Sequence, residues 1–300
     1  MTNVRLEFTN ADRDAAIRLI DLALQEDLAG IGDLTCNSLI GPKDRAEVLV
    51  VARETGIVAG LPIGELVFAQ VDPLVGWVPE VADGTLVQPG QIVARAAGPL
   101  TGILIGERTT LNFLGHLSGI ASLTGEFVNA AQGTTATILD TRKTLPGWRS
   151  LAKYAVRAGG GSNHRMGLFD GVLIKDNHLA GWQTAHETAS IAAAIIQARE
   201  RSPEGLSIEV EVDTLAQLDD ALDAPPDIVL LDNMNCETLR EAVALRDRKA
   251  PQVQLEASGG VTLETVAPIA ATDVERISIG ALTHSAPSLD LAFDWQPTRS

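Results

Sequence analysis

The sequence predicts an α/β fold in two parts: a mixed α+β domain at the N-terminus, then a parallel sheet whose strands alternate with helices. Two patterns predict this. The first hundred residues combine a long amphipathic helix with short β segments and turn signals, whereas from residue 134 short apolar runs alternate regularly with helical runs. The 300 residues are 45% hydrophobic and 21% charged, which is ordinary for a globular chain with a large core.

The first expected element is an amphipathic helix over residues 12–28. Ile17, Ile20 and Leu24 recur at helical spacing, and Gly30 follows as a stop signal. The rest of the first domain has shorter elements. They are a strand at 47–52, a helix at 62–71 that starts with a proline, β segments at 85–87 and 92–96 flanked by Asp-Gly and Pro-Gly turns, and a helical bridge at 105–131.

The second part contains six apolar β runs separated by helical runs. The β runs are 136–140, 171–175, 207–212, 227–232, 253–257 and 276–280; the helical runs are 151–158, 183–201, 214–222, 236–248 and 263–270. This alternation predicts a parallel sheet with right-handed crossovers, and we expect it to close as a barrel. A doubly wound open sheet is the alternative, although no Gly-x-Gly-x-x-Gly follows a strand.

One window reverses the charge of the chain. The formal net charge is −16, yet residues 138–175 hold seven Lys or Arg against two acids, and three of the five lysines lie there. Solvated helix faces normally mix both signs, so the window indicates an anionic ligand. The pI near 4.7 argues against general nucleic-acid binding but not against a small polyanion.

The ends of all six β runs are polar. In parallel barrels the chemistry lies at the carboxyl ends of the strands, so six polar ends together indicate a site. The end residues are Asp140, Arg142 and Lys143; Lys175, Asp176 and His178; Glu209, Glu211 and Asp213; Asp232 and Asn233; Glu256 and Ser258-Gly259-Gly260; and Gly280, Thr283 and His284.

Three acids share one face of the third run. Glu209, Glu211 and Asp213 alternate with valines, so either the acids or the valines point inward. A solvent-facing edge strand is the simple alternative; inward acids would need cations or a metal. We favour the inward arrangement, since Lys175 offers a partner. Glu211 and Asp232 end neighbouring strands and would hold a hydrated Mg²⁺.

Two glycine-rich loops complete the candidate site. Ser258-Gly259-Gly260 precedes a helix, where free N–H groups bind phosphate, although a Gly-Gly pair is more often a simple turn. The loop 159–165 ends in His164-Arg165. Lys175 is also placed for Schiff-base chemistry, which some barrel enzymes perform with a strand-end lysine.

Cys36 and Cys236 are isolated and lack metal-site spacing, so we interpret them as reduced thiols. The N-terminus has no apolar signal core and no apolar run reaches membrane-spanning length. These features predict a cytoplasmic protein.

Taken together, these motifs resemble the quinolinate phosphoribosyltransferases (carboxylating nicotinate-nucleotide pyrophosphorylases). The matching strings occur in the family's order over nearly the whole chain, and they are specific as a set. They are residues 25–28 and 32–35, 107–112, 140–144, 163–168, 173–178, 209–213, 230–233, 256–260 and 279–284.

The resemblance implies an N-terminal α/β sandwich domain over residues 1–115, with the tail 285–300 packed back onto it. It implies an incomplete α/β barrel over residues 116–284. It also implies a homodimer in which the N-terminal domain of one subunit caps the barrel of the other. The implied reaction joins quinolinate to phosphoribosyl pyrophosphate, giving nicotinate mononucleotide, pyrophosphate and CO₂, a step of NAD biosynthesis.

The resemblance also implies roles for individual residues. Lys143, Lys175, Glu211 and Asp232 would be catalytic, with Mg²⁺ at the two acids. The quinolinate carboxylates would be bound by Arg142, His164, Arg165 and Lys175, with Arg108 from the partner subunit. Lys143 and Lys153 would face phosphate and pyrophosphate groups, and the ribose 5-phosphate would lie against Ser258, Gly259, Gly260, Gly280 and His284.

Three alternatives remain at this point. A sibling enzyme would use nicotinate or another pyridine, although the many cations favour a dicarboxylate. A Schiff-base lyase would use Lys175, and borohydride trapping would reveal it. A phosphate-sugar binding protein would bind ligand without releasing pyrophosphate.

Overall fold

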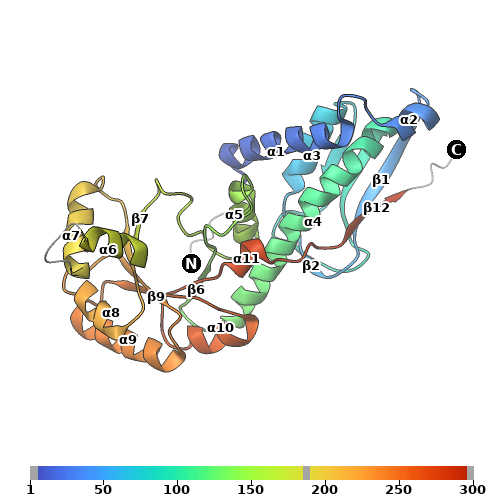
Figure 1. Cartoon of the computed structure of the whole chain (residues 1–300). Helices are drawn as coiled ribbons and strands as arrows, with labels where there is room; N and C mark the ends of the chain where they lie inside the picture. The colour runs from blue at the N-terminus through green and yellow to red at the C-terminus, as the bar shows by residue number, and fades with distance from the viewer. Residues whose placement is uncertain (1–5, 185–189, 296–300) are drawn as a thin grey trace. The chain divides into compact units, whose positions relative to one another are not determined.

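The structure is a computed structural model that describes residues 6–184 and 190–295 (Figure 1). The chain forms two compact units. The first contains Met1–Gly125, Lys143–Gly160 and Ala281–Ser300, and the second contains Glu126–Arg142 and Gly161–Gly280. Each unit has its own sheet, and the two units are described separately.

The sheet of the first unit is antiparallel, in the strand order β12-β1-β5-β3. Its strands are β1 (Arg45–Ala52), β3 (Gly76–Pro79), β5 (Ile92–Pro99) and β12 (Leu291–Trp295). A two-stranded sheet pairs β2 (Gly56–Ile57) with β4 (Leu86–Val87). The strands expected at 47–52, 85–87 and 92–96 are confirmed. β12 pairs with β1, Val50 opposite Phe293, so the end of the chain joins the N-terminal sheet.

The helices of the first unit are α1 (Asn10–Leu28), α2 (Leu34–Leu39), α3 (Leu61–Val71), α4 (Leu100–Ala130), α5 (Arg149–Ala158) and α11 (Ala281–His284), and the last residues of α4 belong to the second unit. Thr9 forms a capping box with Asp12 at the start of α1. The hydrophobic core of this unit includes the fully buried Val50, Phe68 and Ile103.

Helix α5 belongs to the first unit, although residues 143–160 fall within the range expected for the barrel. Its side chains explain this placement. Ser150 donates a hydrogen bond of 2.6 Å to Asp12, Arg157 lies 3.3 Å from the same carboxylate, and Tyr154 donates one of 2.5 Å to Asp83. Asp12 and Asp83 therefore hold α5 against the N-terminal elements.

The second unit has a six-stranded parallel sheet in the order β6-β11-β10-β9-β8-β7. Its strands are β6 (Thr137–Leu139), β7 (Val172–Ile174), β8 (Ile208–Val212), β9 (Ile228–Asp232), β10 (Gln254–Ser258) and β11 (Arg276–Ser278). All six lie within one residue or two of the predicted runs. In the described part of the chain, β6 and β7 form the two edges, so this sheet is open between them.

The helices of this unit are α6 (Asp176–Gln183), α7 (Ile191–Arg201), α8 (Leu215–Ala221), α9 (Cys236–Lys249) and α10 (Leu263–Ala270). The single helix expected at 183–201 is wrong. α6 ends at Gln183, and Ser190 starts α7 by accepting a hydrogen bond from Ala193 N–H. Part of that expected helix, residues 185–189, lies outside the described residues. No helix in the described ranges is long and apolar enough to cross a bilayer.

Strand β8 shows how the sheet positions polar groups. Val210 and Val212 are buried on one face of the strand. Glu209 and Glu211 lie on the other face, where Glu209 is 4% exposed and contacts His164. The solvent-facing alternative is therefore wrong for Glu209, and the inward orientation requires partners for its charge.

Candidate active site

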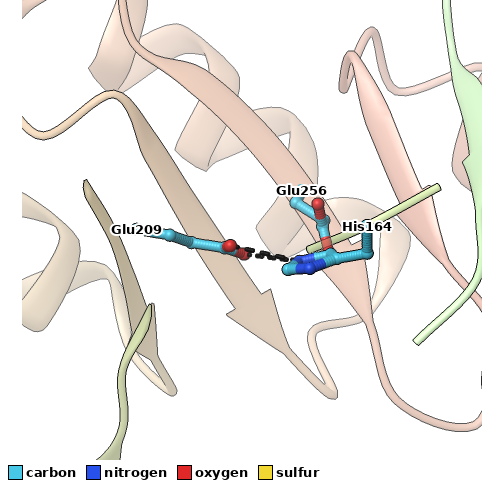
Figure 2. Close-up of side chains that lie close together, drawn as sticks. All are labelled: His164, Glu209 and Glu256. Carbon is cyan, nitrogen blue, oxygen red and sulfur yellow. Dashed lines mark hydrogen bonds and ion pairs between the residues drawn. The ribbon is translucent and has the colours of Figure 1, made fainter. Parts of the chain in front are cut away.

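Three buried side chains meet inside the second unit: His164, Glu209 from β8 and Glu256 from β10 (Figure 2). His164 Nε2 lies 3.1 Å from Glu209 Oε2 and 3.3 Å from Glu256 Oε1. Their candidate ligand atoms all lie within 4.8 Å of one another. We refer to these three residues as the interior cluster.

The two ring nitrogens of His164 have different partners. Nε2 faces the carboxylates, whereas Nδ1 accepts a hydrogen bond of 2.8 Å from the backbone N–H of Arg165. Burial lowers the pKa of His164, but the hydrogen bonds to Glu209 and Glu256 outweigh it and raise the pKa to about 9. The Arg165 N–H can donate to Nδ1 only while Nδ1 carries no proton, so this contact belongs to the neutral ring with its proton on Nε2. The carboxylates favour the charged ring and the Arg165 N–H favours the neutral one; in both forms Nε2 carries a proton and faces the carboxylates.

Glu256 and Glu209 differ in their environment. Burial raises the pKa of Glu256, but His164 and Arg276 reverse this and lower it overall. Arg276 Nε donates to Glu256 Oε2 at 2.7 Å, whereas Glu256 Oε1 makes no hydrogen bond with the described residues. Burial raises the pKa of Glu209, the hydrogen bond from His164 opposes it, and the charge of Glu256 adds to the rise.

Asp140, at the end of β6, holds the loop that carries His164. Its carboxylate is fully buried and accepts hydrogen bonds from Asn163 Nδ2 at 2.6 Å and from His164 N at 3.0 Å. The loop backbone is therefore fixed from the sheet at His164, and the His164 ring fixes the next residue, Arg165.

The positive charges of Arg165 and Arg142 act on each other. Burial lowers the pKa of Arg165, and the charge of Arg142 lowers it further. Arg165 Nη1 donates to the backbone carbonyl of Gly171 at 3.1 Å. Neighbouring guanidinium groups repel each other unless an anion lies between them, and they match carboxylates with paired hydrogen bonds. This arrangement favours a carboxylate ligand.

The ends of β7, β8 and β9 carry a second group of charges. Lys175 Nζ forms an ion pair of 2.5 Å with Glu211 Oε2. Burial raises the pKa of Asp232, and the charges of Glu211 and Asp213 raise it further. The carboxylates here thus outnumber the cation that compensates them. Glu211 and Asp232 are oxygen donors with excess negative charge, so they fit a divalent cation such as Mg²⁺.

The loop after β10 approaches the loop after β9 closely. Asn233 N donates to Ser258 O at 2.9 Å, and both Asn233 and Gly259 have positive φ angles. A Cβ on Gly259 would lie 2.2 Å from Asn233 Oδ1, so only glycine fits there. Space is open beside Gly260. The proposed phosphate contact of these glycines remains a prediction.

The predicted site residues divide between the units. Those in the second unit are Arg142, His164, Arg165, Lys175, Glu211, Asp232, Ser258, Gly259, Gly260 and Gly280. Those in the first unit are Arg108, Lys143, Lys153 and His284. Lys153 is fully buried, whereas Arg108 and Lys143 are exposed. His284 Nδ1 lies 2.6 Å from Ser285 Oγ, and Lys143 O accepts a hydrogen bond from Thr283.

The sequence prediction assigned no role to Glu256 or Arg276. The signal was present: Glu256 is an acid within an otherwise apolar run, and Arg276 begins the following run. In the structure they lie opposite each other on β10 and β11. Asp140 and Asn163 were noted in the sequence, but their contacts depend on a loop whose path the sequence does not give.

Comparison with known proteins shows the family of this chain. The quinolinate phosphoribosyl transferase N-terminal domain matches residues 33–118, and the C-terminal domain matches residues 120–294. This chain belongs to the quinolinate phosphoribosyltransferase family. The two matches cover both units and every predicted site residue.

Individual relatives agree with the family. The chain is 43% identical over 288 residues to the nicotinate-nucleotide pyrophosphorylase [carboxylating] of Mycobacterium leprae, covering 95% of this chain and 99% of that protein. It is 41% identical to the probable enzyme of the same name from Bacillus subtilis, covering 92% of each. The crystal structure of NadC from Streptococcus pyogenes superposes with a TM-score of 0.88 at 36% identity, covering 98% of this chain and 100% of that one.

Proposed function

We propose that this protein transfers the phosphoribosyl group of phosphoribosyl pyrophosphate to quinolinate and releases pyrophosphate and CO₂, which makes it a pentosyltransferase of NAD biosynthesis. One observation carries the proposal beyond family membership. Arg142 and Arg165 are two cations of the second unit whose charges act on each other, and Glu211 and Asp232 belong to the carboxyl-terminal ends of the neighbouring strands β8 and β9 of the same unit. A dianionic acceptor needs paired arginine contacts for its carboxylates, and a pyrophosphate donor needs carboxylates that hold its Mg²⁺.

The arginine pair would orient quinolinate. Each guanidinium presents a planar fork that matches a carboxylate, so Arg142 and Arg165 would bind the ring carboxylates in a fixed plane. Lys175 would add a third positive charge. The proposed direct contact of His164 differs from its arrangement in the structure, where Nε2 faces Glu209 and Glu256 and Nδ1 faces Arg165 N. His164 would therefore act mainly by holding Arg165.

Glu211 and Asp232 would hold Mg²⁺, which, when bound, neutralises charge on the departing pyrophosphate. The protein's own contribution at this point is electrostatic. Loss of pyrophosphate leaves positive charge on the ribose, and the carboxylate of Glu211 would stabilise it. Lys175, held 2.5 Å from Glu211, would keep that carboxylate oriented.

By the family resemblance, Lys143 and Lys153 would contact phosphate and pyrophosphate, and the ribose 5-phosphate would lie against Ser258, Gly259, Gly260, Gly280 and His284. After the pyridine nitrogen is ribosylated, the quaternary ring accepts the electrons of the C–CO₂⁻ bond. Decarboxylation then needs no carbonyl cofactor.

The structure disfavours a Schiff-base lyase. Lys175 is in an ion pair with Glu211, and an ammonium group is not a nucleophile. Treatment with borohydride and a carbonyl ligand should therefore leave Lys175 unmodified.

We also propose a cytoplasmic homodimer with a shared site, as the family resemblance implies. The free thiols Cys36 and Cys236 suit a reducing compartment. If Arg108 serves the partner's site, Arg108→Ala and Lys143→Ala proteins should each be nearly inactive alone. Mixed dimers would have one site with neither lesion, so refolding the two together should restore roughly a quarter of wild-type activity.

The test of the reaction is direct. The protein is incubated with phosphoribosyl pyrophosphate, Mg²⁺ and quinolinate labelled in the ring 2-carboxylate, and labelled CO₂ and pyrophosphate are counted. Release of both in equal amounts supports the proposal. Nicotinate in place of quinolinate is the control; turnover with nicotinate and none with quinolinate would contradict the proposal.

A further inference from the structure

A continuous series of contacts runs from β11 to Arg165 through the interior of the second unit. Arg276 Nε donates to Glu256 Oε2 at 2.7 Å. Glu256 Oε1 and Glu209 Oε2 lie 3.3 and 3.1 Å from His164 Nε2. His164 Nδ1 then accepts the backbone N–H of Arg165 at 2.8 Å.

Stability alone does not account for this cluster. Burying two carboxylates is expensive, and apolar side chains of the same volume usually stabilise a protein as well or better. Glu256 is 0% exposed, and its Oε1 makes no hydrogen bond with the described residues. Such a group is retained where its orientation matters to something else. The contact that leads from this cluster toward the arginine pair is the one between His164 and Arg165 N.

The side chains of the interior cluster are also spaced like the ligands of a cation site, but their hydrogen bonds argue against a bound cation. A histidine that binds a metal through Nε2 carries its proton on Nδ1 and donates it to an acceptor. Here Nδ1 is itself the acceptor, so Nε2 keeps its proton. Arg276 adds a positive charge 2.7 Å from Glu256, which also opposes a cation.

We propose that Glu256 and Arg276 are positioning residues for quinolinate binding, because through the His164 ring they fix the backbone of Arg165. This inference rests on the proposed function. The charge of Arg142 lowers the pKa of Arg165, so the two guanidinium groups repel each other. Asp140 fixes the loop one peptide earlier, at His164 N. The ring contact fixes the backbone of Arg165, and the hydrogen bond from Arg165 Nη1 to the Gly171 carbonyl at 3.1 Å holds its guanidinium end. A fixed backbone limits the positions from which this guanidinium can meet a planar carboxylate.

The principal variant is Glu256→Gln, which keeps the size of the side chain and removes its charge. We expect the Kd for quinolinate, measured by calorimetry, to rise about tenfold, because the charge that faces His164 Nε2 at 3.3 Å is removed. We expect the KM for phosphoribosyl pyrophosphate and kcat to change less than about twofold, because binding is lost equally in ground and transition states.

The matched control is Glu275→Gln. Glu275 also forms an ion pair with a buried arginine, Arg246 at 2.9 Å, and it precedes Arg276 directly. Among the described residues it forms no hydrogen bond or ion pair with His164, Glu209 or Glu256, and its Oε2 accepts a hydrogen bond of 2.8 Å from the backbone N–H of Leu255. We expect a lower Tm and an unchanged Kd for quinolinate. Equal changes of Kd in both variants would overturn the proposal, since general loosening of β11 would then explain them.

A double-mutant cycle tests the route through His164. In a His164→Gln background the path from Glu256 to Arg165 is already broken, so adding Glu256→Gln should change the Kd by less than about twofold. Additive tenfold effects would overturn the proposal. If Glu256→Gln does not fold, Arg276→Gln removes the partner that orients Glu256, and an unchanged Kd in that variant would overturn it equally.

Two further outcomes separate the hypotheses. A stoichiometric divalent metal in the purified wild type, absent from Glu256→Gln, would overturn the proposal in favour of a cation site. Wild type that binds quinolinate without releasing CO₂ would contradict the proposed function, while the Kd series would still decide the positioning role. Wild type that binds no quinolinate would overturn both.

Discussion

The two sheets of this protein have opposite interiors. Among the described residues, the strands of the antiparallel sheet in the first unit bury only apolar side chains, among them the fully buried Val48, Val50 and Ala94, and the buried polar groups of this unit, such as Thr110 and Lys153, lie on helices. The parallel sheet of the second unit buries Asp140, Glu209 and Glu256. Removing a carboxylate from water costs several kcal/mol unless partners compensate it. The difference indicates that the first sheet is a scaffold and that the second holds its charges for a ligand.

Removal of divalent metal should change the turnover more than any other test of this comparison. If Glu211 and Asp232 hold Mg²⁺, excess chelator should abolish nearly all turnover, because the carboxylates then repel the pyrophosphate. Adding Mg²⁺ back should restore the rate. The Tm should stay unchanged, since the proposed metal lies at the strand ends and not in either core. Full turnover in excess chelator would remove the metal from the mechanism.

Lys175→Ala should be the next largest effect. It removes a positive charge that faces Glu211, so we expect a loss of about a hundredfold in kcat/KM with a normal far-UV spectrum and Tm. Lys249→Ala is a suitable control, because Lys249 also binds carboxylates, Asp219 and Asp223, but lies on α9. Near-normal turnover of folded Lys175→Ala would exclude Lys175 from the site.

Phe68→Ala tests the scaffold side of the comparison. Phe68 is fully buried in the core of the first unit, and its ring centroid lies 5.7 Å from that of Trp77, with the ring planes tilted by 34°. Its truncation should lower the free energy of unfolding by about 3–5 kcal/mol. The catalytic constants per folded molecule should change little. A folded Phe68→Ala protein with strongly reduced kcat would mean that the first sheet does more than support the fold.

The smallest expected effect concerns Cys36. Burial, together with the hydrogen bond and the charge of Asp33, raises the pKa of this thiol to about 11. A raised thiol pKa means less thiolate at pH 8, so alkylation of Cys36 should be slow. In Asp33→Ala the hydrogen bond and the charge are gone, so alkylation of Cys36 should become several times faster. Helix α2 also loses its N-cap, which should lower the free energy of unfolding by about 1 kcal/mol. Peptide mass spectrometry measures both rates; an unchanged rate in Asp33→Ala would mean that burial alone protects Cys36.

The sequence predicted the parts of the fold that depend on local pattern. Six strands of the second unit follow from apolar runs bounded by polar ends, and the alternation in 208–212 placed Glu209 and Glu211 on one face. Pairings between distant segments were beyond local pattern. The register of Glu256 opposite Arg276 depends on which strands become neighbours. The association of α5 with the first unit depends on Asp12 and Asp83, more than 60 residues away in sequence.

The candidate site was predictable where it depends on local sequence pattern and not where it depends on tertiary packing. Residues such as Lys175 and Asp232 follow strands directly, so the strand positions locate them. The path of the 159–171 loop, and with it the contact of His164 with two carboxylates, depends on tertiary packing. The sequence named His164 but not the groups that hold it.

The central proposal is that Arg142 and Arg165 of the second unit recognise a dicarboxylate. The direct measurement is the ratio of Kd values for nicotinate and quinolinate, by calorimetry, in wild type and in Arg165→Ala. The second carboxylate should make wild type prefer quinolinate by about a hundredfold, and Arg165→Ala should reduce that preference by about tenfold or more. An unchanged ratio in folded Arg165→Ala would contradict the account.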